Sequence, residues 1–340
     1  MEGGSIMRRS AATVMAVAIA VVATACYQDF DFGADHKADR YYVDEHDDWW
    51  DATTGTKVLD AEPGDRPVPA DWDGDHIWDK ALLRPNGDWV TGSTVGTIHF
   101  PAPAQLPDFV SGTASGYYFI LPVPGDYDGD GRADPAWYRD SDATWFIEGM
   151  APVVFGSGPT EWPPGGSALD LDQDFPVPAD YDGDGITDLA TFNPRTLAWS
   201  VRSSADGSIE TVVMQHNQGL PLPVPADFDD VDHAQRATAG YEGWDIEGHE
   251  LVVFGETDGN YPAVADYDGD GRADLSYTNG TGIWRTQGST EELDIVPGSA
   301  ANYDVFPLTM SRNLIDNIGR FTYVGMCHFD PAYCEGVTPA

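Results

Sequence analysis

Basic residues are scarce in this sequence. Its 340 residues include 17 Lys and Arg against 57 Asp and Glu, which gives a formal net charge of −40 at pH 7. A surface with this charge repels nucleic acid and anionic lipid headgroups, so both are poor partners, and we expect no nucleic-acid partner. The excess of acid instead suits an exterior that is rich in salt or calcium.

The common catalytic motifs are also missing. The sequence has no Gly-x-Ser-x-Gly elbow, no His-Glu-x-x-His helix, no phosphate-binding loop and no dinucleotide-binding glycine pattern. Its eight histidines are scattered, and there are only three cysteines. Carboxylates abound, however, and a glycosidase or lyase needs only two or three of them. A carbohydrate-active enzyme therefore stays open as an alternative.

An apolar run at residues 11–25 follows Arg8 and Arg9. The run is short for a membrane span, and a charged start followed by a short apolar run and small residues is typical of a secretory signal peptide. Cys26 follows Ala23-Thr-Ala25, which resembles a bacterial lipobox. We expect a lipoprotein signal at 1–25, a lipid anchor on Cys26, and a location outside the cytoplasm on a bacterial membrane or surface. Simple cleavage before Cys26 is the alternative.

The other two cysteines, Cys327 and Cys334, enclose a six-residue loop near the C-terminus. Outside the cytoplasm such a pair is most often a disulfide, and we expect one that cross-links the C-terminal tail at 311–340. A metal site is the other interpretation, with His328 as its one additional ligand.

A nine-residue acidic loop, Asp126-Tyr-Asp-Gly-Asp-Gly-Arg-Ala-Asp134, has carboxylates at positions 1, 3, 5 and 9 and Gly131 at position 6. Two carboxylates about 5 Å apart repel by about 3 kcal/mol at an effective dielectric near 20. A hard divalent cation relieves this repulsion, and Ca²⁺ tolerates irregular oxygen ligation better than Mg²⁺. Glycine at position 6 allows a sharp turn without a Cβ penalty.

This loop recurs along the chain. Four copies, counting the first, carry all four acids: Asp126, Asp128, Asp130 and Asp134; Asp180, Asp182, Asp184 and Asp188; Asp266, Asp268, Asp270 and Asp274; Asp71, Asp73, Asp75 and Asp79. The last copy has His76 at position 6, which is strained if its φ is positive. We expect Ca²⁺ in the three glycine-containing loops and a fourth ion in the His76 loop.

Two further copies are degenerate. One begins at Asp227 and Asp229 but has Val231 and Gln235 in place of the later acids. The other, with Asp29, Asp31, Asp35 and Asp39, is interpreted as carrying a two-residue insertion. Calcium binding is in doubt at both.

Two other interpretations of the complete loops must be weighed. An EF-hand needs a Glu at position 12 and flanking helices, whereas Pro122-Val-Pro124 and Trp137-Tyr138 favour strands on both sides. Asp-Gly pairs are also common in plain solvated turns. Repetition of the whole nine-residue pattern favours the cation over the turn.

The loops mark repeated units. From Asp29, the starts are 42, 55, 54, 47 and 39 residues apart, and each unit has a tryptophan after its loop: Trp50, Trp89, Trp145, Trp199, Trp244 and Trp284. Each unit is predicted to contain four short strands, with the acidic loop between the first two and the tryptophan in the third. Such repeats predict propeller blades with the tryptophans in the core between them.

The first unit lacks a first strand, and a matching strand follows the last complete unit at 303–308. We expect this segment to complete the first blade and close the ring, which removes open sheet edges. The prediction is an all-β fold: a six-bladed β-propeller of four-stranded antiparallel blades. A seven-bladed propeller is the alternative, if 311–340 form a degenerate blade.

The run Pro-Val-Pro-Ala/Gly-Asp-Tyr-Asp-Gly-Asp-Gly-x-x-Asp, followed by a Trp strand, resembles the FG-GAP/VCBS repeat family, whose relatives include the calcium-binding blades of integrin α-subunit propellers. Arg84-Pro-Asn-Gly-Asp-Trp89 matches the turn and Trp strand of the bacterial form. The resemblance covers about 29–300. It implies a β-propeller, assigned here to 26–310, with calcium between the first and second strands of its blades.

These features predict a monomeric, surface-anchored, calcium-binding propeller that acts in binding or adhesion, without catalysis, on polysaccharide or protein ligands. The alternative is a calcium-dependent polysaccharide lyase or glycosidase with its site at the mouth of the central channel. Two long connections, 101–117 and 156–175, are either linkers or ligand-binding loops. Trp162, in the second, is the candidate for ligand contact.

Replacement of Cys26 tests the lipid anchor. We expect Cys26→Ala to move the protein from the membrane fraction to the soluble fraction, because the acylated atom is removed. Cys327→Ala serves as the control and should stay in the membrane fraction. Continued membrane attachment of Cys26→Ala would contradict acylation.

Overall fold

The computed structural model describes residues 30–43, 48–104, 120–158, 173–217, 221–255, 260–279, 283–289, 292–294 and 306–307. Every regular element in these ranges is a β-strand. Nowhere in them does a helix reach the length and apolar character that a membrane span needs. Cys26, Trp162, Cys327 and Cys334 lie outside the described residues, as do the signal peptide and the tail, so those predictions stay predictions.

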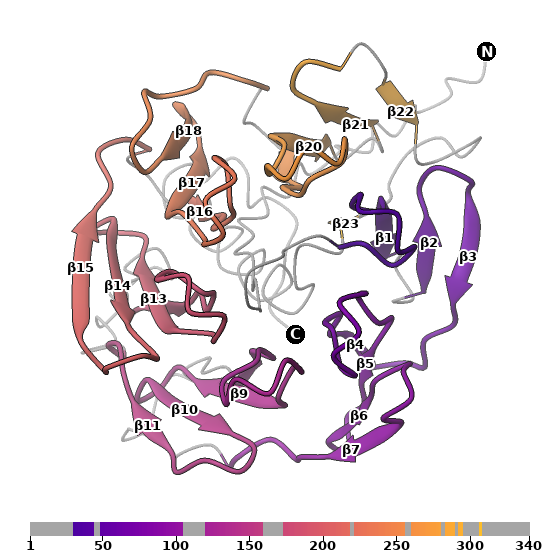
Figure 1. The fold of residues 1–340 in the computed structure, drawn as a ribbon, viewed down its shortest axis with the longest axis vertical. Helices are drawn as coiled ribbons and strands as arrows, with labels where there is room; N and C mark the ends of the chain where they lie inside the picture. The colour runs from indigo at the N-terminus through magenta and orange to yellow at the C-terminus, as the bar shows by residue number, and fades with distance from the viewer. Residues whose placement is uncertain are drawn as a thin grey trace, which may run out of the picture.

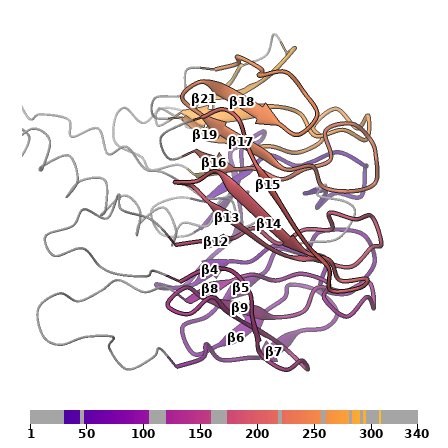
Figure 2. The same ribbon diagram turned by 90° about the vertical axis from the view of Figure 1, so that its left-hand side faces the viewer.

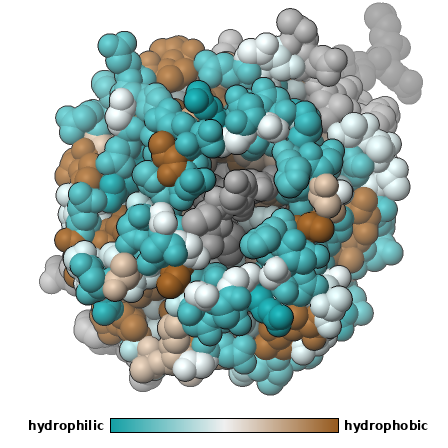
Figure 3. Space-filling view, in the orientation of Figure 1, coloured by the Kyte–Doolittle hydropathy of each residue, from teal (hydrophilic) through white to brown (hydrophobic). Residues whose placement is uncertain are grey.

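The strands form small antiparallel sheets that follow one another in chain order around a central axis (Figure 1). Seen from the side, the sheets occupy a single layer (Figure 2). This arrangement is a β-propeller, as predicted. The face seen in Figure 1 is largely hydrophilic, with hydrophobic residues in small separate groups (Figure 3).

Five sheets have four strands and one has three. The first contains β1 (Tyr41–Val43), β2 (Trp49–Asp51), β3 (Thr56–Leu59) and β23 (Phe306–Pro307). The second contains β4 (Arg66–Pro67), β5 (Leu82–Leu83), β6 (Asp88–Val90) and β7 (Thr97–His99). The third contains β8 (Ile120–Pro122), β9 (Ala136–Arg139), β10 (Thr144–Ile147) and β11 (Val153–Val154).

The fourth sheet contains β12 (Phe175–Pro176), β13 (Leu189–Asn193), β14 (Ala198–Arg202) and β15 (Ile209–Val213). The fifth contains β16 (Leu222–Pro223), β17 (Ala237–Gly240) and β18 (Gly243–Ile246). The sixth contains β19 (Asn260–Pro262), β20 (Ser276–Asn279), β21 (Ile283–Thr286) and β22 (Glu292–Asp294). In the fifth sheet, the strand expected near Leu251 is reduced to a single bridge between Trp244 and Val252.

The two ends of the repeat region meet in the first sheet. Tyr42 pairs with Pro307 and Val43 pairs with Phe306, both antiparallel. This confirms that residues 306–307, within the predicted segment 303–308, supply a strand to the first unit. A sheet that takes strands from both ends of a chain closes a ring without a free inner edge.

The tryptophans of five units are core residues, as predicted. Trp89, Trp145, Trp199, Trp244 and Trp284 are each at most 3 % exposed. They also join neighbouring sheets, since Trp89 of the second sheet contacts Trp137 of the third with ring centroids 5.3 Å apart. The prediction fails in the first unit. A register shift between Trp49 and Trp50 in β2 places Trp49 in the core, while Trp50 is only half-buried and stacks on Tyr42.

Two of these buried indoles differ in one hydrogen bond. The Nε1–H of Trp145 donates to the carbonyl of Phe155 at 2.9 Å, whereas that of Trp49 has no acceptor among the described residues. We expect Trp145→Phe to lower the free energy of unfolding by about 1–3 kcal/mol more than Trp49→Phe, because it leaves a buried carbonyl unpaired. Denaturant titration of both variants measures this difference. Equal losses would contradict it.

Candidate metal centres

The acidic loops share one backbone conformation. Positions 4 and 6 have positive φ in every copy, as at Gly129 (77°) and Gly131 (85°). His76 adopts φ 66°, so the strain expected at that position is present. The degenerate loop that begins at Asp227 places Asp230 and Asp232 at φ 59° and 58°. Glycine therefore eases this turn but is not required for it.

The first loop corrects the interpretation of an insertion. Ala34 and His36 have the positive φ of positions 4 and 6, so Asp31 is position 1 and Asp39 is position 9. No residue is inserted, and Asp29 lies outside the described residues. The missing acid is at position 3, where Gly33 stands. The spacing misled because Asp29 and Asp31 are two residues apart, as positions 1 and 3 of the complete loops are.

Two hydrogen bonds recur in all six loops. The carboxylate at position 1 accepts the N–H of position 6, and the side chain at position 9 accepts the N–H of position 2. In the third loop these bonds join Gly131 to Asp126 (2.8 Å) and Tyr127 to Asp134 (2.9 Å). The corresponding bonds in the other loops are equally present. Each loop is thus folded by its own acids, which brings their remaining oxygens together.

The residue at position 2 anchors the loop in the core. Tyr127 and Tyr181 donate their hydroxyls to the carbonyls of Val123 and Val177 in the preceding segment, at 2.8 and 2.7 Å. Tyr267 packs edge-on against Trp284 of its own unit at 5.7 Å. Tyr181 packs edge-on against Trp199 in the same way, at 6.2 Å, so in these two units the loop contacts the Trp strand.

The loops are also bonded to one another around the ring. The backbone N–H at position 8 of each loop donates to the position-1 carbonyl of the preceding loop. The six bonds are Trp78 to Asp31, Ala133 to Asp71, Thr187 to Asp126, Ala234 to Asp180, Ala273 to Asp227 and Ala38 to Asp266, at 2.6–2.9 Å. The last returns to the first loop, so these bonds form a closed circle. Sequence reasoning missed them, because backbone groups leave no residue signal.

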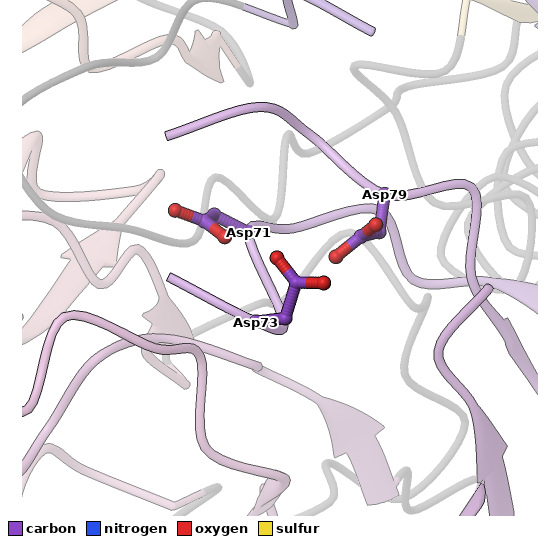
Figure 4. A group of neighbouring side chains, drawn as sticks. All are labelled: Asp71, Asp73 and Asp79. Carbon is purple, nitrogen blue, oxygen red and sulfur yellow. The ribbon is translucent and has the colours of Figure 1, made fainter. Parts of the chain in front are cut away.

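Four loops gather carboxylate oxygens within 4.8 Å of one another. The groups are Asp71, Asp73 and Asp79; Asp126, Asp128 and Asp134; Asp180, Asp182 and Asp184; Asp266, Asp268 and Asp274. In Figure 4 the carboxylates of Asp73 and Asp79 point toward each other, with Asp71 beside them. These are the four loops in which the sequence predicts ions, and each group offers three carboxylates from one loop.

The fourth predicted ligand of each loop lies outside its compact group, and its carboxylate accepts backbone N–H groups. Asp75, Asp130 and Asp270 each accept the N–H of the residue two positions on, at 2.9–3.0 Å. In the remaining loop the outlier is Asp188, both of whose oxygens are occupied by backbone N–H groups, from Tyr181 (2.8 Å) and Ser204 (2.7 Å). Asp184, which belongs to its compact group, accepts the same bond from the N–H of Ile186 at 2.9 Å, so this bond alone does not decide which acid lies outside.

Residues after the third strand support two of the groups. Thr94 donates its N–H and hydroxyl to Oδ2 of Asp73, while Oδ1 of Asp73 is buried without a hydrogen-bond partner among the described residues. Ser203 and Ser204 donate their hydroxyls to Asp182 and Asp184 at 2.6 and 2.9 Å. Nothing in the repeat pattern singles out these hydroxyl groups, so sequence reasoning did not find them.

Crowding and burial oppose ionisation of the acid at position 9. Burial, with further contributions from the neighbouring aspartates, raises the pKa of Asp134 to about 7 and that of Asp79 to about 6. The same two causes raise the pKa of Asp188 to about 6. Negative charge is therefore held at these points against an electrostatic cost that a cation would remove.

The degenerate loop at Asp227 has a neutral glutamine at position 9 in place of the acid. Gln235, at position 9, accepts the N–H of Phe228 through Oε1 and donates through Nε2 to Asp229, both at 2.9 Å. His249 also contacts Asp229, with Nε2 2.9 Å from Oδ2. Here the carboxylate at position 3 contacts nitrogen atoms of two side chains, whereas Asp73 and Asp182 at the same position accept from Thr94 and Ser203.

The sequence matches no protein-family model and no curated protein. One solved structure that resembles the chain is that of an Agrocybe aegerita lectin that specifically recognises non-reducing terminal N-acetylglucosamine. The two share 16% sequence identity with a TM-score of 0.43, over 80% of this chain and 69% of the lectin chain. At this level of similarity the ligand of the lectin carries no information about this chain.

Asp134 predicts a pH dependence for the metal-free protein. Because its folded pKa is raised above that of the unfolded chain, its contribution to stability is complete at low pH and is lost as the pH rises through about 7. In the presence of a chelator we expect Asp134→Asn to be more stable than wild type at pH 7.5, and this advantage to shrink toward pH 4.5.

Asp206→Asn is the matched control, because hydrogen bonds from Ser208 lower the pKa of that exposed carboxyl. Its sign is opposite: the lost stability should appear at pH 7.5 rather than at low pH. Melting temperatures across this range measure both effects. An Asp134→Asn variant that is less stable than wild type at pH 7.5 in chelator would show that the carboxylate is not strained.

Proposed function

We propose that the chain is a calcium-binding, six-bladed β-propeller of the FG-GAP/VCBS type, exported as a lipoprotein, that serves as a non-catalytic binding module outside the cell. The observation that carries this proposal is the recurrence of one carboxylate group in four loops of one ring. Its ligand would be an extracellular polysaccharide or protein.

The donor set suits calcium. Each group consists only of carboxylate oxygens, which hard cations such as Ca²⁺ prefer. Asp73 offers a buried oxygen with no hydrogen-bond partner among the described residues, and the raised pKa of Asp134 reflects burial beside other acids. The residues that would hold the ions are the four groups given above. Bound calcium would supply the positive charge that these groups lack.

The proposed blade count rests on two observations. The circle of loop-to-loop hydrogen bonds has six members and returns to its first loop. The sheet with three strands retains the bridge between Trp244 and Val252 at the place of its fourth strand. Six units therefore account for the whole circle. The fifth unit has only a single bridge in place of its outer strand.

A structural role for calcium explains why the loops are placed where they are. Position 1 of each loop uses its side chain for the cluster and its carbonyl for the bond to the next loop. Neutralising the cluster would therefore stabilise the same residue that joins neighbouring sheets. The resulting ring is a rigid scaffold whose connecting loops are free to bind ligands.

Removal of the acids in one loop tests the calcium role. We expect the double variant Asp182→Ala, Asp184→Ala to lose about 1–3 kcal/mol of the stabilisation that 10 mM calcium confers, which corresponds to one site with a dissociation constant of about 10⁻⁴–10⁻³ M. Thermal unfolding with calcium and with EGTA measures the loss.

The matched control is Asp206→Ala, an exposed acid outside the loops. It should respond to calcium as wild type does. If the double variant keeps the full calcium-dependent shift in melting temperature, this loop is only a turn and the proposal fails at this site.

A further inference from the structure

The outer strand of the fourth sheet is unusual among the described edges of the ring. β15 is five residues long, and it pairs with β14 on one side only (Figure 1). The other outer strands are shorter, at two to four residues. In β15 the side chains of Ile209 and Val213 are 63% and 51% exposed.

The backbone orientation of β15 follows from its hydrogen bonds. Met214 donates its N–H to Leu197, at 3.0 Å, and Ser203 donates its N–H to Ser208, at 2.9 Å. Both pairs continue the register in which Trp199 opposes Val212. In an antiparallel ladder bonded residues alternate with residues that face outward. Residues 210 and 212 therefore bond to β14.

The alternate residues of β15, Ile209, Thr211 and Val213, direct their N–H and C=O groups away from the sheet. A side chain already uses one of these groups: Nε2 of Gln215 donates to the carbonyl of Val213 at 2.9 Å. That contact requires the carbonyl to face outward, which agrees with the register. The free edge thus offers polar backbone groups from three alternate residues.

Among the residues that the structure describes, none of the usual devices against pairing protects this edge. Natural edge strands are blunted by lysine, by proline or by inward-pointing charges. β3, the outer strand of the first sheet, contains Lys57. The one charged residue of β15 is Glu210, whose carboxylate is paired with the guanidinium of Arg236, the residue before β17. The outward-facing residues are uncharged and mostly β-branched, which favours strand pairing.

We propose that the outer edge of β15 binds an extended polypeptide segment of net positive charge, which adds a strand to the fourth sheet. Only a polypeptide repeats donors and acceptors every two residues, about 6.8 Å, as this edge does. The charge of −40 on the chain would steer a basic segment toward it and repel an acidic one. The inference rests on the proposed binding function, for which it names a partner class, but not on the calcium sites.

The test uses a fluorescein-labelled synthetic peptide, Lys-Val-Thr-Val-Thr-Val-Lys, and fluorescence anisotropy at low salt with the full mature chain. We expect Thr211→Pro to weaken binding at least tenfold. It removes one outward N–H, and proline is tolerated at edge positions whose N–H faces solvent. Val213→Lys, which adds a gatekeeper charge, should weaken binding likewise and covers the case in which the proline variant does not fold.

Two controls separate strand pairing from general attraction. A peptide N-methylated at alternate residues should not bind, because the methyl groups block its pairing edge. Val154→Lys, at an exposed valine of the outer strand β11, should bind the unmodified peptide as wild type does. On binding, hydrogen exchange at the amides of Ile209, Thr211 and Val213 should slow at least tenfold.

The outcomes are distinct from those that test calcium. The variant Asp182→Ala, Asp184→Ala should bind the peptide as wild type does, even if it has lost its response to calcium. Equal binding of the peptide to wild type and Thr211→Pro, or no binding at all, would overturn the proposal. So would sedimentation of wild type as a dimer and of Thr211→Pro as a monomer, since the edge would then serve a second copy of the chain.

Discussion

Repulsion between carboxylates is the constraint on which the rest of this structure depends. Each complete loop holds three acids with oxygens within 4.8 Å, and the residue that begins the loop also accepts the backbone hydrogen bond from the next loop. Charge is thus concentrated at the joints between sheets. A small sheet has little core of its own, so the stability of the ring depends on those joints and on the tryptophans packed between them.

The degenerate loops separate the role of the backbone from that of the charge. They keep the positive φ at positions 4 and 6 and the circle of hydrogen bonds, although one lacks the acid at position 3 and the other has Gln235 at position 9. The loop fold therefore does not require the full set of acids. In the loop at Asp227, the amide of Gln235 and the imidazole of His249 satisfy Asp229 directly. The proposed cation would therefore compensate for crowded acids rather than act as the template of the turn.

Much of this architecture could be predicted from the sequence, because its signals are local. The nine-residue loops, the Trp strands and the closing strand each occupy one short segment. The exceptions are set by contacts across the fold. The bulge that buries Trp49 in place of Trp50 depends on strand pairing that spacing does not encode. So does the second N–H that Asp188 accepts, which comes from Ser204, just after β14. The outward direction of Thr211 is likewise a property of register.

A count of bound ions tests the central claim most directly. Equilibrium dialysis of the chain against calcium up to about 10⁻² M, well above the expected dissociation constants, should find four Ca²⁺ per molecule at saturation, one for each compact carboxylate group and none for the loops at Asp31 and Asp227. A chain that holds no calcium, or whose ions are unaffected by replacement of Asp128, Asp182 and Asp268, would contradict the account.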